Sequence, residues 1–272
     1  MTLRTNEPVV KSLAKKAHAL HQRLVVAIRR SAPFARRVSA KRVFFPGCSL
    51  TGGGGELTLQ VYEHLRRHEA DIDIWLSCCG MPVQKYSGKK HGLTDLHNLA
   101  AEVRSQGITE VITACGNCYE RFQKLRDQVP ELKVTSLYAW LTSYPIAAAS
   151  GERFLVHHPC PAKVDADLKR SFASCAAACN VNLGNGNAND ASLLCCLVKS
   201  EAQNRRIDKV KDSKIITWCG HCVKQFQSRL DITHVLSLLF NRPAGMYTAS
   251  AARAFRRTKK RLANRSAGGE NL

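Results

Sequence analysis

The sequence is poor in acidic residues and has no apolar run long enough to cross a membrane. It contains 21 Asp and Glu against 41 Lys and Arg, and residues 235–240 are among its longest apolar segments. A transmembrane helix needs about 20 apolar residues, so no span is predicted. Near the N-terminus, the four apolar residues 25–28 are too few for the core of a signal peptide. We therefore expect a cytoplasmic protein whose thiols stay reduced.

Two familiar cysteine arrangements are also missing, although the chain has 12 cysteines. The CxxCxxCxxxCP run of ferredoxin-type cubane sites does not occur. A disulfide framework requires a secreted context, which nothing in the sequence indicates. The cysteines are therefore expected to serve metal or redox chemistry.

Ten of the cysteines form one pattern twice: a single cysteine, an adjacent pair and a CxxC. The flanks repeat too, since VITACGNCYERFQ at 111–123 aligns with IITWCGHCVKQFQ at 215–227. Five soft sulfur ligands at one site suit an iron–sulfur cluster better than a single ion. The first cysteine set is Cys48, Cys78, Cys79, Cys115 and Cys118, and the second cysteine set is Cys160, Cys195, Cys196, Cys219 and Cys222.

Between its ends the chain alternates short β-rich segments with helical ones, which indicates an α/β fold with parallel sheets. Strands are predicted at 43–45, 72–76, 111–113, 154–157 and 215–218, and helices around 56–68, 94–105 and 117–126. Residues 144–153, with Pro145 and Gly151, form the expected linker. The predicted divisions are a basic N-terminal arm at 1–42, modules at 43–150 and 151–249, and a basic C-terminal tail at 250–272.

The cysteines follow the predicted strands. Cys48 comes after the first strand, Cys78 after the second and Cys115 after the third, and Cys160 and Cys219 have the same relation to strands of the second half. Open α/β sheets bind ligands at the carboxyl ends of their strands. Sulfurs far apart in the sequence should therefore meet in one crevice in each half.

The segments FFPGCSL, CCGMP and ACGNC resemble the repeated CCG module of the heterodisulfide reductase B subunit family, over about residues 43–240. The resemblance implies two related α/β modules in a pseudo-twofold arrangement, with small, mostly parallel sheets flanked by helices. It implies that the first and second cysteine sets each ligate a non-cubane [4Fe-4S] cluster. It also implies electron transfer or disulfide reduction within a complex. Because this chain has no ferredoxin-type motif, electrons would come from a separate ferredoxin-type or flavin subunit.

The second half departs from the family pattern. Leu197 stands where the glycine of the CCG motif is expected, whereas Gly80 fills that place in the first half. A side chain at 197 would crowd a backbone that needs a tight turn, which leaves the second cluster open. Cys175 and Cys179 lie outside the repeat and share a helix face at i, i+4, as core residues do, although either is a possible replacement ligand.

The net charge of +20 is concentrated at the two ends. Residues 1–42 carry +10 and residues 250–272 carry +6. Residues 9–37 have helical periodicity, with an apolar stripe of Val10, Leu13, Ala17, Leu20, Leu24 and Ile28. A basic amphipathic helix suits an anionic membrane surface, here the inner face, or an acidic partner, or it packs on its own body. The C-terminal tail is similar, with more disorder expected, and nucleic acid is disfavoured because neither arm interleaves aromatic residues.

Two other functions remain open. A zinc-stabilised adaptor with basic arms would use four ligands a site, but each half offers only one CxxC. A thiol-disulfide oxidoreductase is suggested by WCGHC at 218–222, although that function gives the adjacent cysteine pairs no role. His157 and His158, beside Cys160, are candidate hydrogen-bond donors to cluster sulfur. Lys85, Lys89 and Lys90 are candidates for offsetting thiolate charge or contacting an anionic substrate, as alternatives to a solvated loop.

Overall fold

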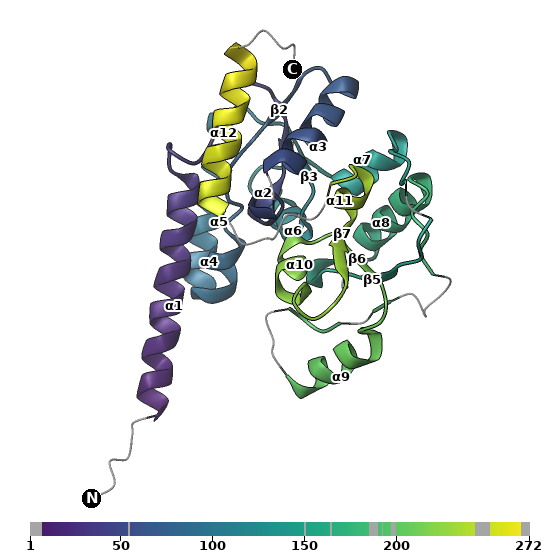
Figure 1. Ribbon diagram of the computed structural model, residues 1–272. Coiled ribbons are helices and arrows are strands. Elements are labelled where there is room, and N and C mark those ends of the chain that lie inside the picture. Colours follow the sequence, from purple (N-terminus) through teal and green to yellow (C-terminus); the bar gives the residue numbers. More distant parts are fainter. Residues whose placement is uncertain are drawn as a thin grey trace, which may run out of the picture.

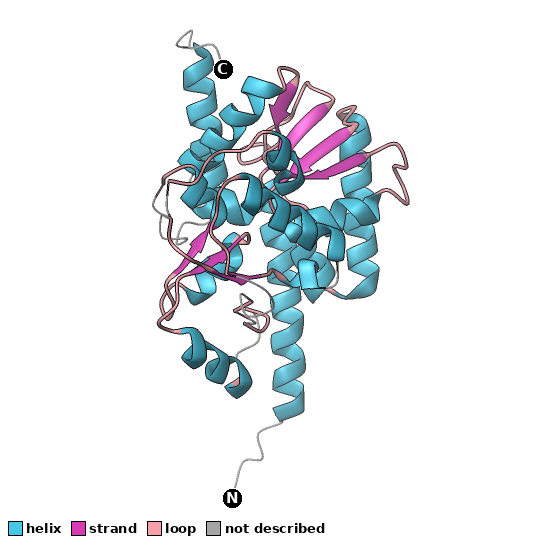
Figure 2. Cartoon of the chain, turned by 90° about the vertical axis from the view of Figure 1, so that its right-hand side faces the viewer, coloured by secondary structure: helices cyan, strands magenta, loops and turns pink. Residues whose placement is uncertain are grey.

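The computed structural model confirms the α/β fold, with two small parallel sheets flanked by helices (Figures 1 and 2). It describes residues 7–53, 55–149, 151–163, 165–184, 190–191, 193–196, 200–242 and 251–267. The first sheet has the order β2-β1-β3-β4 and the second β5-β6-β7. The strands are β1 Arg42–Phe45, β2 Ile72–Ile74, β3 Glu110–Thr113, β4 Lys133–Ser136, β5 Leu155–His157, β6 Ile215–Thr217 and β7 Ile232–His234.

Helices connect successive strands of the first sheet, as parallel pairing requires. The helices of this half are α2 Gly47–Gly53, α3 Gly55–His68, α4 Met81–Tyr86, α5 Gly88–Ser105, α6 Gly116–Leu125 and α7 Leu137–Ser143. The second half contains a 3-10 turn η1 Cys160–Lys163 and the helices α8 Ala166–Ala178, α9 Glu201–Val210, α10 Gly220–Phe226 and α11 Val235–Leu239. The predicted strands and helices all occur, while β4 and β7 were not predicted.

The strands are aligned so that their carboxyl ends lie at one edge of each sheet. Phe45 pairs with Thr113, Thr113 with Ser136, and His157 with Thr217. The buried strand residues, such as Val43, Ile112 and Ile216, bring nearly continuous apolar segments into the interior, as expected when both faces of a parallel sheet are covered. A cysteine follows the carboxyl end of β1, β2, β3, β5 and β6 within four residues.

The two halves share one hydrophobic core. Tyr138 on α7 donates a hydrogen bond to the carbonyl of Ala114 (3.2 Å), and its ring meets Trp218 edge to face. Trp218 in turn stacks on Phe172 of α8, with ring centroids 5.0 Å apart. Helices α7 and α8 pack against each other, so the two sheets are fixed relative to one another. The domain boundaries and the pseudo-twofold relation stay predictions.

Both ends of the chain form helices that pack on the body. The N-terminal helix is α1 Glu7–Arg30, shorter than the predicted 9–37 region at its C-terminal end, and it packs on α4 through Val26. The C-terminal tail was expected to be the more disordered arm, but residues 251–267 form α12 Ala251–Ala267. This helix packs on α2 and α3 and buries Phe255 completely. Among the described residues, no helix is both long and apolar enough to span a bilayer.

Candidate metal centre

The first cysteine set converges at the carboxyl edge of the first sheet. Cys48 lies in α2, Cys78 and Cys79 follow β2, and Cys115 and Cys118 lie at the start of α6. Gly47, with φ +77°, brings α2 close to α6. A Cβ atom added there would lie 3.1 Å from the Cys115 Cβ and 3.1 Å from the Cys118 Sγ.

The pKa values of these thiols show that they interact with one another. Hydrogen bonding to Cys48 lowers the pKa of Cys78 to about 6, and the same contact raises the pKa of Cys48 well above its usual value. Hydrogen bonds with Cys115 and then Cys79 raise the pKa of Cys118. Hydrogen bonding to Cys118 lowers the pKa of Cys115 to about 7. These hydrogen bonds form two groups, and the charge of Cys79 in one group also acts on Cys48 in the other. Some of the contacts favour the thiolate that metals bind.

Two arginines hold the backbone of the adjacent cysteine pair. Arg30, from α1, donates to the carbonyl of Cys78 (2.8 Å), and Arg121, from α6, donates to the carbonyl of Cys79 (3.2 Å). Asp95 on α5 joins the two guanidinium groups, at 2.8 Å from Arg30 and 2.9 Å from Arg121. We call Arg30, Asp95 and Arg121 the arginine clamp. It was not predicted from the sequence, because nothing in the spacing of these three residues connects them.

The structure explains the glycine of the CCG motif. Gly80 has φ +80°, which side chains other than glycine rarely adopt. A Cβ atom added at this position would lie 1.7 Å from Asp95 Oδ2 and 2.8 Å from a terminal nitrogen of Arg30. Gly80 is therefore needed both for the tight turn, as predicted, and for room beside the arginine clamp.

Arg29 is a further residue of the first site that sequence reasoning missed. Its guanidinium donates a hydrogen bond to Cys48 Sγ at 3.4 Å. Burial would lower the pKa of Arg29, and negative charge at Cys48 and Cys78 outweighs this and raises it. The terminal turn of α1 thus supplies a cation to the first cysteine set.

The second cysteine set also converges, but it is less buried. Burial, followed by hydrogen bonding to Cys195, raises the pKa of Cys160 to about 11. Hydrogen bonding to Cys222 lowers the pKa of Cys196, while contacts with Cys196 and then Cys219 raise the pKa of Cys222. The thiols of CGHC are therefore connected to the adjacent pair rather than forming a separate dithiol. Leu197, the position that departs from the family pattern, lies outside the described residues.

Polar groups around the second set include side chains without a hydrogen-bond partner. Gln203 donates to the carbonyl of Cys195 (3.0 Å). His157 and His158 are buried, and burial lowers the pKa of His157 to about 3 and that of His158 to about 4. Within the described part of the chain, Nδ1 of each of these histidines and Nε2 of His221 have no partner. His221 lies between Cys219 and Cys222 in the sequence. A buried nitrogen without a hydrogen-bond partner at this place is consistent with a site where a bound cofactor supplies the partner.

The two cysteine sets lie near one another. Helix α6 packs on η1, where Gly116 allows close contact with Pro159 and Pro161. The charge of Lys85 acts on Cys115 of the first set and on Cys160 and Cys196 of the second. Lys85 also donates to Asn117 Oδ1 at 3.0 Å. Lys85 is therefore near both sets, but its side chain is exposed, as are those of Lys89 and Lys90 on α5.

The chemistry of each set fits a multi-metal cluster. Five thiols are present in each, and across the described residues no three His, Cys, Asp or Glu side chains surround a point as they would a single ion. Cys175 on α8 and Cys179, which caps the C-terminal end of that helix, stand apart in the core, with sulfurs 4.0 Å apart.

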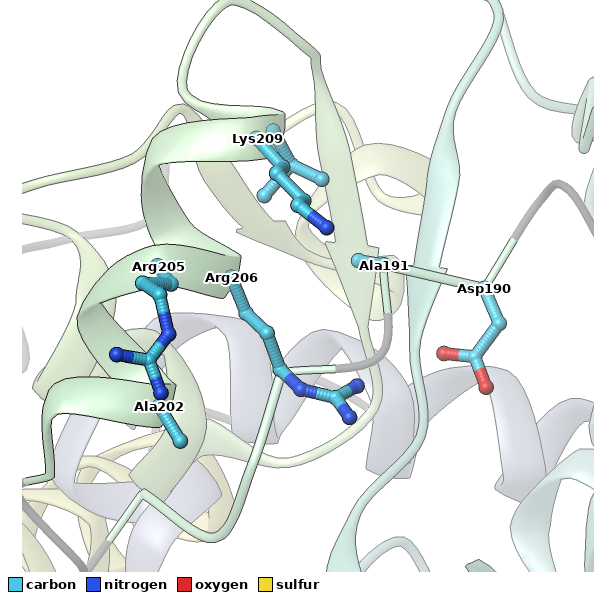
Figure 3. A pocket seen from close by; sticks show the side chains of 7 residues that line it. Asp190, Ala191, Ala202, Arg205, Arg206 and Lys209 are labelled. Atoms are coloured by element: carbon cyan, nitrogen blue, oxygen red, sulfur yellow. The ribbon is translucent and has the colours of Figure 1, made fainter.

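A cavity of about 530 Å³ lies away from both sets, beside α9. Figure 3 shows Arg206 and Lys209 extending from α9 toward the segment that carries Asp190. Arg205 and Arg206 are exposed, and Arg205 pairs with Glu201 on its own helix. No cysteine lines this cavity, so it is not part of the candidate metal centre.

A comparison with known families agrees with the position of the first site. No curated protein matches the chain. One segment of the chain, residues 42–123, does match a protein family, and it contains all of the first cysteine set and ends before the second. It indicates an iron–sulfur or other metal-binding function. Residues 42–123 match the family described as the CCG cysteine-rich domain.

Proposed function

We propose that the protein is an iron–sulfur subunit of a heterodisulfide-reductase-like complex, with one non-cubane [4Fe-4S] cluster at each cysteine set. The observation that supports this most strongly is the convergence of two five-thiol sets near one lysine, Lys85. When bound, such clusters supply one-electron transfer at a potential set by nearby charges and hydrogen bonds. The protein would then pass electrons to a partner or use them to reduce a disulfide.

The chain's own residues contribute positioning and charge. The arginine clamp orients the turn that carries Cys78 and Cys79, and Arg29 places positive charge beside Cys48. Lys85 lies where an anionic substrate or the carboxylate of a partner would meet both sets. Burial of the first cysteine set strengthens the arginine contacts there relative to water.

The proposal includes a separate electron donor. The chain has no ferredoxin-type cubane motif, so a ferredoxin-type or flavin subunit would deliver the electrons. The complex would work in the cytoplasm, at the inner face of the membrane.

The test is anaerobic purification followed by iron, sulfide and zinc analysis, with absorption and paramagnetic resonance spectra of the same sample. Two clusters predict about eight irons and eight sulfides per chain, and one cluster about four of each. Stoichiometric zinc without iron would support a zinc-stabilised adaptor instead. Protein without metal whose CGHC thiols exchange with disulfides would support the oxidoreductase alternative.

A further inference from the structure

Helix α1 presents an aliphatic stripe to the surroundings rather than to the protein. We define the aliphatic stripe as Leu13, Leu20, Leu24 and Ile28, whose side chains are 61 %, 54 %, 55 % and 46 % exposed. Val26, which packs on the body, is 2 % exposed. At 100° per residue, Val26 lies on the opposite side of the helix from the centre of the stripe. Helix α1 therefore packs on the body through one face and exposes the aliphatic stripe on another.

Basic residues border the aliphatic stripe on one side, and a histidine borders it on the other. Lys16 and Arg23 are exposed along one border, and His21 is exposed along the other. Glu7 is the one acidic residue of α1, a full turn or more before the stripe begins. An amphipathic helix with aliphatic residues on one face and basic residues beside it has the composition of helices that lie in a lipid interface.

A second basic helix lies beside α1. Helix α12 packs beside the C-terminal end of α1 (Figure 1), and Lys259 donates to the carbonyls of Ala32 and Ala35 in the segment that follows α1. Its sequence contains no acidic residue. Exposed on α12 are Arg253, Arg256, Arg257, Lys260 and Arg261. The charge predicted at opposite ends of the sequence is thus gathered in two neighbouring helices.

The arrangement favours a lipid surface over a protein partner. The N-terminal part of α1 extends past α4, away from the rest of the molecule (Figures 1 and 2), so a flat surface can approach the stripe unobstructed. The stripe contains only Leu and Ile and forms a line rather than a pocket. Anionic headgroups complement the basic border, and acyl chains complement the stripe.

We propose that α1 docks on an anionic lipid bilayer, with the aliphatic stripe in the interface and the basic residues of α1 and α12 at the headgroups. Docking is independent of the cluster assignment, since it depends on the terminal helices alone. It also has a consequence for the first site. Arg29 and Arg30, at the end of the same helix, contact Cys48 and Cys78, so a docked α1 holds the first cysteine set close to the membrane surface.

The experiment is flotation of the full chain with vesicles of phosphatidylcholine alone or with about 30 % phosphatidylglycerol added. We expect at least about tenfold stronger binding to the anionic vesicles, reduced when salt is raised from about 50 mM to about 500 mM. The double variant Leu20→Ser/Leu24→Ser should bind about tenfold more weakly, because it removes apolar area from the interface. Lys16→Gln/Arg23→Gln should weaken binding by a similar factor.

The matched control is Leu93→Ser on α5, which also replaces an exposed leucine (48 % exposed) but lies outside the aliphatic stripe. It should float as the unmodified chain does. All of these positions are exposed, so circular dichroism should show unchanged folding. If the intact chain does not float with anionic vesicles at low salt, or if the stripe variant floats equally well, the proposal is wrong. Retention of α1 by a protein instead of by vesicles would overturn it in the same way.

Discussion

The two cysteine sets occupy equivalent sheet edges, yet their surroundings differ. In the first set, Cys78 and Cys79 are 0 % and 3 % exposed, whereas Cys195 and Cys196 of the second are only half-buried. Charged groups hold the first adjacent pair, through the arginine clamp. A neutral amide, that of Gln203, holds the carbonyl of Cys195.

The two sites also differ in which parts of the chain supply the residues that hold the adjacent cysteine pair. The first site depends on α1, α5 and α6, so residues from 29 to 121 must assemble before it is complete. The second site takes Gln203 from the helix that follows its adjacent pair directly. Removing partner groups from buried ion pairs costs far more than removing an amide hydrogen bond. The first site should therefore be the more rigid and the more sensitive to substitution.

The largest expected effect comes from removing one ligand in each set. Cys79→Ala should remove about four irons and leave the second cluster, and Cys196→Ala should remove the other four. Cys175→Ala is the control, because this core cysteine belongs to neither set. Iron and sulfide analysis with resonance spectra distinguishes the variants. Full iron content in Cys79→Ala would contradict the assignment of the first site.

The next largest effect is on the free energy of unfolding, and it compares the ion pairs of the arginine clamp with the amide hydrogen bond of Gln203. Asp95→Asn leaves two arginines with weakened partners and should lower the free energy of unfolding by about 3 kcal/mol. Gln203→Ala, the counterpart in the second half, should cost only about 1 kcal/mol. Urea unfolding followed by circular dichroism measures both. Equal losses would show that the arginine clamp is not what distinguishes the sites.

Much of this arrangement was predictable, since it follows from local patterns. The order of strands and helices follows from apolar segments separated by polar ones, and the cysteines at the strand ends follow from that order. The strand β4 was missed because only Ser136 of its four residues is buried, so its sequence KVTS lacks an apolar pattern.

The residues that hold the first site were not predictable in this way. Arg29, Arg30, Asp95 and Arg121 are single charged residues within helices, and the same residue types occur on solvated helix faces throughout the chain. The stripe on α1 was recognised, but periodicity alone gave no reason for α1 to pack through Val26 instead. Tertiary contacts determine both which charged residues reach the first site and which face of α1 packs on the body.

A third comparison uses pH, because a deeply buried histidine lies in the second half. Burial lowers the pKa of His234 to about 3, whereas unfolded histidine titrates near about 6.5. Between these values the unfolded state binds more protons, so stability falls as pH falls, by up to about 1.4 kcal/mol per pH unit. His234→Asn keeps an acceptor for the amide of Leu236 and should reduce this slope, while the buried His157 and His158 keep their share of it.

The matched substitution in the first half is His64→Asn. His64 is only half-buried, and burial lowers its pKa. Its removal should change the slope of stability against pH much less than His234→Asn does. Urea unfolding between about pH 7 and about pH 5 measures both slopes. Identical slopes in the two variants would contradict the role assigned to burial of His234.

The smallest expected effect is on the midpoint potential of the first cluster, and it tests whether Arg29 of α1 influences that cluster. Arg29 places a cation beside Cys48, and a cation stabilises the more negative, reduced state of a cluster. Arg29→Gln should lower the midpoint potential of the first cluster by roughly 40 mV, about 1 kcal/mol for one electron, and leave the second cluster unchanged. Arg23→Gln removes the same charge from the exposed face of the same helix and should have far less effect. Anaerobic potentiometric titration followed by resonance spectroscopy separates the two clusters. Equal shifts in both variants would mean that α1 acts only through its overall charge, whereas a shift confined to Arg29→Gln would make this helix the element that distinguishes the first site from the second.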